Sequence, residues 1–238
     1  MGLPKIDQPL FELVIPSTGK KVQYRPFTVK EEKILLIAQE SKSTDQIILA
    51  IKQIINNCLV DVDVDTLATF DLEYIIINIR GKSVNNEMTF NITDPDTQED
   101  IELAMDVNDI EVVFDEKHDK KIDLNEQYYI MMRYPSINEV KELQPKAEGE
   151  GSSAESTFAI MMACIETTVN NENDEVFNLA DFTQEEVNDF VGGFTSATME
   201  SIQQFFETMP KMKYSIPYKD NTGKDKSFTV EGMESFFT

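Results

Sequence analysis

Three acidic side chains at alternate positions are the nearest approach to a metal site in this sequence. They are spaced like the first ligands of a calcium-binding loop: Asp61, Asp63 and Asp65. Such a loop needs glycine at its sixth position and glutamate at its twelfth, but Thr66 and Leu72 stand there. We therefore interpret the segment as a connector in which Val62 and Val64 point inward. Its aspartates then face water, and one of them caps the next helix.

Two Thr-Gly-Lys turns contain part of a phosphate-binding P-loop. The first is centred on Gly19 and the second spans residues 222–224. A P-loop needs a further glycine five residues before the Gly-Lys pair, but Val14 and Tyr218 occupy those positions. Both turns are therefore predicted to close β-hairpins rather than to hold phosphate.

Nucleophiles and bases for catalysis are scarce. His118 is the only histidine of the 238 residues, and its charged neighbours predict a solvated side chain. One histidine excludes most His-dependent triads and multi-histidine metal sites. Cys58 and Cys164 lie in apolar stretches, so we interpret them as buried free thiols, with a disulfide or a reactive thiol as the alternative. We predict a protein that is not an enzyme and that carries no cofactor or metal.

The charge of the chain argues against two classes of partner. It has 44 acidic and 21 basic residues, so its formal net charge is −23. A field of that sign repels nucleic acid and anionic membranes. Since 41% of the residues are hydrophobic, the chain is expected to be globular rather than disordered. We predict neither nucleic acid nor membrane as a partner.

Three amphipathic helices are predicted within residues 28–83. The first begins with a capping box, in which Thr28 is followed three residues later by Glu31. The second begins at Thr44 and repeats apolar residues every three or four positions. The third runs from about Asp71 to near Gly81, a residue that favours helix ends.

Alternating apolar residues predict strands on both sides of these helices. A hairpin with its turn at Gly19 precedes them, and residues 87–107 form a second hairpin. Further strands are predicted at 110–114 and, as one long strand, at 122–134.

The C-terminal part reads as mainly helical. Helices are predicted at 156–170, after the capping box Thr183–Glu186, and at 196–208. A third hairpin, within residues 214–230, follows. The predicted fold class is therefore α+β: β-hairpins packed with short amphipathic helices, and a helical C-terminal portion ended by a β-hairpin.

A change of composition predicts the domain organisation. Residues 144–156 are rich in Gly, Ser and Glu, which is typical of a mobile linker. We predict an N-terminal portion at 1–143 and a C-terminal portion at 157–238.

Methionine and phenylalanine recur at helical spacing after this linker. Such a stripe is first of all expected to be core, but methionine also suits adaptable binding surfaces. The candidate partner-binding residues are Phe158, Met161, Met162, Phe205 and Phe206.

Residues 25–83 resemble the baseplate hub and hub-assembly proteins of contractile-tailed bacteriophages of the T-even type. The likeness extends more weakly to about Pro135 and includes the C-terminal segment MPKMKYSIPYKDNTGKDKSF. The residues that carry it are Arg25, Pro26, Phe27, Lys30, Glu31, Glu32, Lys33, Leu67, Phe70, Asp71, Glu73, Arg80, Lys82 and Ser83. The resemblance implies a structural or assembly role with no active site. It implies hub, tape-measure or other tail proteins as partners.

Three functions remain open at this point. The protein is a virion component of the tail baseplate, or it is an assembly factor or chaperone that acts in the host cytoplasm and is absent from the mature virion. The third function is that of an acidic host-directed inhibitor or DNA mimic.

Overall fold

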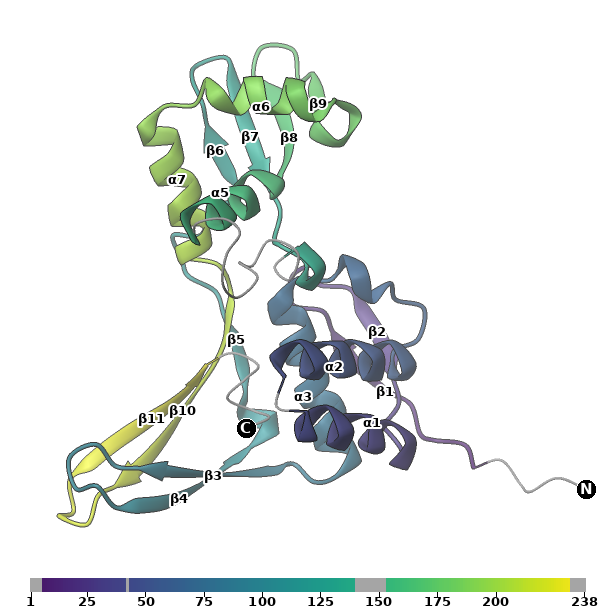
Figure 1. The fold of residues 1–238 in the computed structure, drawn as a ribbon, viewed down its shortest axis with the longest axis vertical. Helices are drawn as coiled ribbons and strands as arrows, with labels where there is room; N and C mark the ends of the chain where they lie inside the picture. The colour runs from purple at the N-terminus through teal and green to yellow at the C-terminus, as the bar shows by residue number, and fades with distance from the viewer. Residues whose placement is uncertain (1–5, 42, 140–152, 232–238) are drawn as a thin grey trace, which may run out of the picture. The chain divides into compact units, whose positions relative to one another are not determined.

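The computed structural model in Figure 1 describes residues 6–41, 43–139 and 153–231. Helices and small antiparallel sheets make up an α+β fold, which confirms the predicted class. The chain groups into two compact units. Unit 1 comprises Met1–Val113 and Lys211–Thr238, and unit 2 comprises Phe114–Pro210. The boundary predicted at 144–156 stays a prediction, because residues 144–152 lie outside the described ranges.

Unit 1 begins with a hairpin and three helices. The turn between β1 and β2 contains Gly19 at a φ of 67°, a left-handed conformation that glycine adopts without strain. The third helix extends two residues beyond the prediction at each end, so Gly81 does not end it. The elements are β1 (Phe11–Val14), β2 (Lys21–Tyr24), α1 (Val29–Glu40), α2 (Thr44–Cys58), the 3₁₀ turn η1 (Val64–Thr66) and α3 (Thr69–Ser83).

The core of unit 1 is built mainly by α2 and α3. The isoleucines of α2 repeat every three or four positions and form one apolar face, whereas those of α3 lie on most of its sides. The most deeply buried side chains of the two helices are Ile51, Ile54, Ile55, Leu72, Ile75, Ile76, Ile77 and Ile79. Val64 of the aspartate-rich connector is buried as expected, while Asp63 caps the turn η1 rather than α3.

Two longer hairpins complete unit 1, and both confirm the sequence prediction. The tip of the first is joined to the second, because the buried carboxylate of Asp94 pairs with Lys226 at 2.9 Å and accepts a hydrogen bond from Tyr218 at 2.8 Å. These ionic and hydrogen-bond contacts lower the pKa of Asp94 and raise that of Lys226. The strands are β3 (Glu87–Thr93), β4 (Asp100–Asp106), β5 (Glu111–Val113), β10 (Lys211–Lys219) and β11 (Asp225–Glu231), with the turn η2 (Val107–Asp109) before β5.

Unit 2 places helices on a four-stranded antiparallel sheet of order β6-β7-β8-β9 (Figure 1). Its buried core joins residues of this sheet, including Ile130, to Ile202 and Phe205 of the last helix. The elements are β6 (Lys121–Asp123), β7 (Tyr128–Met132), α5 (Ser153–Ala163), β8 (Ile165–Asn170), β9 (Val176–Asn178), the turn η3 (Leu179–Asp181), α6 (Gln184–Gly192) and α7 (Ser196–Glu207).

Two predicted elements of unit 2 are wrong. The long strand at 122–134 is a hairpin of β6 and β7. Asn125 forms its turn by accepting hydrogen bonds from the backbone N–H groups of Gln127 and Tyr128. The helix at 156–170 ends at Ala163, and the β-branched residues that follow form β8 instead. Strand β8 pairs with β7, a segment distant in sequence, and this pairing overrides the helical spacing of its apolar residues.

His118 is not solvated as predicted. One ring nitrogen lies 3.0 Å from the hydroxyl of Thr208 and the other lies 3.0 Å from the hydroxyl of Tyr134. The ring also stacks on Tyr134 and packs against Phe205. Burial, with a smaller effect of the Lys120 charge, lowers the pKa of His118.

Candidate functional site

An arginine–glutamate pair joins the hairpin of unit 1 to its first helix. The guanidinium of Arg25 pairs with Glu31 at 3.0 Å, and its backbone N–H donates to the carbonyl of Cys58. The carboxylate of Glu31 also accepts from the backbone and hydroxyl of Thr28, which confirms the predicted capping box. Burial favours the neutral acid, but the hydrogen bonds from Arg25 and Thr28 outweigh it and lower the pKa of Glu31 to about 2.

Unit 2 repeats this arrangement. The guanidinium of Arg133 pairs with Glu139, and the backbone N–H of Arg133 donates to the carbonyl of Cys164 at 2.8 Å. Glu139 accepts from the backbone and hydroxyl of Ser136, both at 2.9 Å. The hydrogen bond from Arg133 is the main reason why the pKa of Glu139 falls to about 2.

The elements around the two pairs also correspond. Each arginine follows the second strand of a hairpin, and each cysteine follows or ends a helix. A 3₁₀ turn then leads into a helix whose third residue is acidic: Asp71 in α3 and Glu186 in α6. Tyr24 pairs with Leu59 just as Met132 pairs with Ile165. The two units therefore share one supersecondary frame.

Several residues that carry the family resemblance have structural roles. Asp71 is fully buried and accepts a hydrogen bond at 2.9 Å from the backbone N–H of Ser17 in the first hairpin turn. Ser83 accepts from the backbone N–H of Phe27 at 2.8 Å. Together with Arg25 and Glu31, these side chains fix the hairpin and helices of unit 1 to one another. The family resemblance at these positions is therefore better explained by their role in holding the fold together than by contact with a ligand.

The strongest candidate for a binding surface is an apolar groove in unit 2. It lies between α5 on one side and η3 with α6 on the other, and its volume is about 930 Å³. Two of its aromatic rings are unusually open to solvent, since Phe158 is 48% exposed and Phe182 is 44% exposed. Its main apolar residues are Phe158, Met162, Leu179, Phe182, Val187 and Val191. We call this surface the groove.

A smaller side pocket of about 480 Å³ adjoins the groove and shares Leu179, Phe182 and Val187 with it. It is bordered by Phe190, which is 37% exposed. Thr168 lines this pocket, and its buried hydroxyl has no hydrogen-bond partner in the described part of the chain. Buried hydroxyl groups normally have a partner, so this hydroxyl is an exception behind the apolar wall of the pocket.

The structure separates the five predicted partner-binding residues. Phe158 and Met162 line the groove. Phe205 is only 2% exposed and belongs to the core, against which Met161, Met162 and Phe206 pack as partly buried neighbours. A role in binding is therefore proposed below only for Phe158 and Met162.

Sequence reasoning missed the α6 side of the groove. Val187 and Phe190 follow helical spacing after a capping box that Phe182 directly precedes, which is also the pattern of a helix that packs into a core. Only the structure shows that the rings of Phe182 and Phe190 stay open to solvent. The sequence did indicate that part of α6 is exposed, because this helix is too rich in acidic residues to be buried on all sides.

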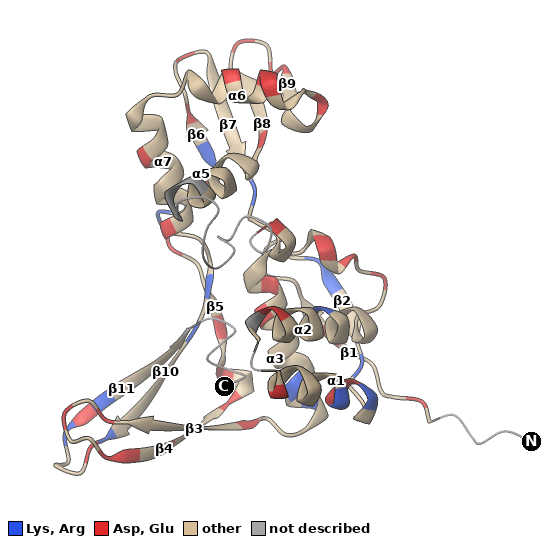
Figure 2. Cartoon of the chain, in the orientation of Figure 1, with Lys and Arg blue, Asp and Glu red and all other residues tan. Residues whose placement is uncertain are grey.

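The groove lies in an acidic part of the chain that lacks basic residues. Figure 2 shows red and no blue residues along α6 and α7. Residues 153–210 contain no lysine, arginine or histidine. The acidic residues in this range are Glu155, Glu166, Glu172, Asp174, Glu175, Asp181, Glu185, Glu186, Asp189, Glu200 and Glu207.

Other kinds of site have little support in the described residues. No cluster of three or more His, Cys, Asp or Glu side chains within them has the geometry to hold a metal ion. Both cysteines are buried and free, as predicted, and burial raises the pKa of Cys58 to about 11 and of Cys164 to about 12. Across the same ranges, no helix combines the length and apolarity needed to cross a bilayer.

Comparison with protein families identifies the chain. A family model described as T4 bacteriophage base plate protein matches residues 8–238, which is nearly the whole sequence. The chain therefore belongs to this family, and it is a structural protein of the phage tail baseplate. Searches among curated proteins and among solved structures find no match.

Proposed function

We propose that this protein is a subunit of the baseplate hub, or a factor that assembles the hub, and that it works by binding other phage tail proteins. It carries out no reaction of its own. The observation that supports this proposal best is the groove, an apolar surface with open aromatic rings in a chain of the baseplate family. Exposed apolar surfaces of this kind are typical of protein–protein contacts.

A second candidate is a transient role, as a chaperone of hub or tape-measure proteins in the host cytoplasm. The net charge of −23 favours it, because a highly charged chain stays soluble before it meets its partner. A subunit of the finished baseplate remains with the particle, whereas a chaperone leaves it.

Two measurements test these proposals. A phage that lacks the gene should still make heads and free tail proteins but should not complete its baseplates, as seen by electron microscopy. Mass spectrometry of purified wild-type particles then separates the two candidates, since only a subunit is present in them. Normal contractile tails in the deletion phage would contradict both candidates and favour an acidic inhibitor of a host protein.

A further inference from the structure

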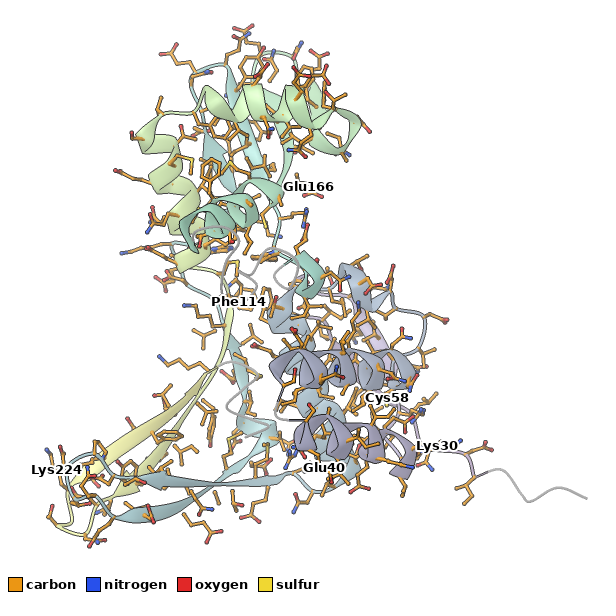
Figure 3. The ribbon with its side chains drawn as sticks, viewed as in Figure 1. Lys30, Glu40, Cys58, Phe114, Glu166 and Lys224 are labelled. Carbon is orange, nitrogen blue, oxygen red and sulfur yellow. The ribbon has the colours of Figure 1, made fainter. Side chains whose placement is uncertain are left out.

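The shared frame of the two units allows their surfaces to be compared position by position. The cysteines that receive the backbone hydrogen bond of each arginine define the register: Cys58 in unit 1, labelled in Figure 3, and Cys164 in unit 2. Lys52 and Phe158 each lie six residues before the cysteine. By the same count, Gln53 corresponds to Ala159 and Asn56 to Met162.

These corresponding residues line a depression in each unit, but their chemistry is opposite. In unit 1 the depression contains Lys52, Gln53 and Asn56, and Lys52 forms an ion pair with Asp65 of η1. In unit 2 the same positions carry Phe158, Ala159 and Met162, and Ala180 of η3 replaces the aspartate. Because unit 1 forms the frame with polar side chains there, the frame itself does not depend on apolar residues at these positions, although Met162 also packs against the core of unit 2.

Unit 1 also shows what kind of element can lie beside the corresponding positions of α2. The opposite wall of its depression is helix α1, which contributes Ile34, Ile37 and Ala38 and lies along α2. In unit 1, a helix with an apolar face thus lies beside this position of the frame. Its counterpart in unit 2 begins at Ile137, and only residues 137–139 of it are described. Helix-in-groove binding uses the same geometry, with apolar anchors every three or four residues.

The charge around the groove indicates the character of its occupant. Glu166, which Figure 3 labels on β8, lines the groove, and Asp181, Glu185 and Asp189 lie on the η3–α6 side. Among the residues that the structure describes, the one cation that lines it is Arg133, which is held by Glu139 and by the carbonyl of Ala163. The surroundings are therefore acidic, and they favour a partner with lysine or arginine flanking its apolar face.

We propose that the groove receives a basic amphipathic helix from another tail protein. This inference rests on the proposed function and names the partner chemistry of the same surface. Phe158, Met162 and Phe182 supply the apolar contact, and the acidic residues around them speed the encounter and orient the helix.

Binding to a defined peptide tests the proposal directly. The probe is a synthetic helix of about 15 residues with leucine at positions i, i+3, i+4 and i+7 and lysine elsewhere. Two control peptides have leucines moved off helical spacing or lysines replaced by glutamate. Fluorescence anisotropy with the full-length protein should give tighter binding to the probe than to either control. Equal affinity for the probe and the rearranged peptide would contradict a shaped groove and indicate charge attraction alone.

The structure supplies a matched variant. The triple substitution Phe158→Lys, Ala159→Gln and Met162→Asn gives unit 2 the residues that unit 1 carries at these positions. It should weaken peptide binding by about tenfold or more while the protein stays folded, with a modest fall in the unfolding temperature because Met162 also packs against the core. A control variant, Leu36→Asn, changes an apolar residue of unit 1 that is 55% exposed and should not affect binding. If the triple variant is folded and binds the peptide as wild type does, the groove is not the site.

The charge contribution is tested separately. Replacing Asp181, Glu185 and Asp189 by their amides keeps the apolar residues of the groove but removes three negative charges. The association rate should fall several-fold at low ionic strength and should depend less on salt than in the wild-type protein. An unchanged rate would contradict the proposed role of charge.

The natural partner is identified by placing a photo-reactive amino acid at position 158 in phage-infected cells. The expected product is a crosslink to a basic amphipathic segment of another tail protein. A crosslink to residues 140–152 of the same chain, or to a second copy, would overturn the proposal. Failure of the proposed function looks different, because baseplates would then assemble normally without the gene even if the groove binds the peptide.

Discussion

The same frame carries a helix that is buried in one unit and exposed in the other. Helix α3 of unit 1 places isoleucines on most of its sides, and seven of its residues are buried. Helix α6 of unit 2 begins with the same kind of acidic cap, but only Val191 within it is buried. A cap and a turn thus determine where each helix begins. The remaining residues of the helix determine whether it builds a core or a surface.

The largest expected difference concerns the positions four residues after each acidic cap residue, Ile75 and Phe190. Ile75 is 0% exposed, so Ile75→Ala should lower the free energy of unfolding by about 2–5 kcal/mol through the cavity it leaves. Phe190 is 37% exposed and contacts Phe194 edge to face, so Phe190→Ala should lower it by only about 1 kcal/mol. Urea titration of both variants measures the difference. Equal losses would show that α6 is packed as tightly as α3.

Mutations in the two arginine–glutamate pairs should differ less in their effect on the free energy of unfolding. The side chain of Glu31 is 5% exposed and that of Glu139 is 24% exposed. Because the more buried carboxylate loses stronger hydrogen bonds, Glu31→Gln should cost about 2–3 kcal/mol and Glu139→Gln about 1 kcal/mol. Hydrogen exchange monitored by mass spectrometry assigns each loss to its unit. A larger loss for Glu139→Gln would reverse the proposed ranking.

Both pairs also predict sensitivity to acid. The pKa of each glutamate falls from its ordinary value of 4.5 to about 2 in the folded chain. A lowered pKa means that the folded state binds the proton more weakly than the unfolded chain. The stabilisation is therefore complete above pH 4.5 and is lost as the pH falls toward 2. The double glutamine variant should lose stability less steeply over this range in urea titrations at a series of pH values.

A smaller effect near neutral pH should be confined to unit 2, since His118 is the only histidine. Its pKa is lowered mainly by burial, with Lys120 opposing the charged ring and Asp119 and Asp115 favouring it. The unfolded chain therefore takes up the proton first, so stability should decline as the pH falls below the ordinary value of 6.5. His118→Gln should remove this decline. If hydrogen exchange in unit 2 does not change between pH 7.5 and 5.5, the ring is not held as described.

The two cysteines should behave alike. Cys58 is 1% exposed and Cys164 is 0% exposed, and the raised pKa of both keeps them as thiols at neutral pH. Alkylation with iodoacetamide should therefore be slow for both in the native protein and fast in urea. Rapid native labelling of one cysteine would show that its unit opens more readily.

Features encoded by neighbouring residues could be predicted from the sequence. The capping boxes at Thr28 and Thr183 and the turn at Gly19 depend on side chains within a few positions, and all three are confirmed. Strand β8 could not be predicted in this way, because its partner β7 lies more than thirty residues earlier. The apolar spacing around Ile165 suits a helix equally well until that partner is known.

The groove and the repeat required the structure for a related reason. The sequence pattern shows that Phe158 and Phe205 are apolar helix residues. The packing of α5 and α7 decides that the ring of Phe158 is exposed and that of Phe205 is buried. The repeat is hard to see in the sequence because the spacing between arginine and proline differs between the two copies. Pro26 directly follows Arg25, whereas Pro135 lies two residues after Arg133. The hairpin of β8 and β9 also lengthens the second copy between Cys164 and η3.

The pairing of Lys211 with Val113 has a consequence for how the protein is made. Unit 2 is inserted into unit 1, and the chain leaves and returns on adjacent antiparallel strands, β5 and β10. The ribosome therefore completes every residue of the insertion before it makes β10 and β11, which close the host unit. Folding during synthesis can then finish the inserted unit first and the host unit last. A nascent chain stalled at Pro210 would contain the whole groove without a completed unit 1.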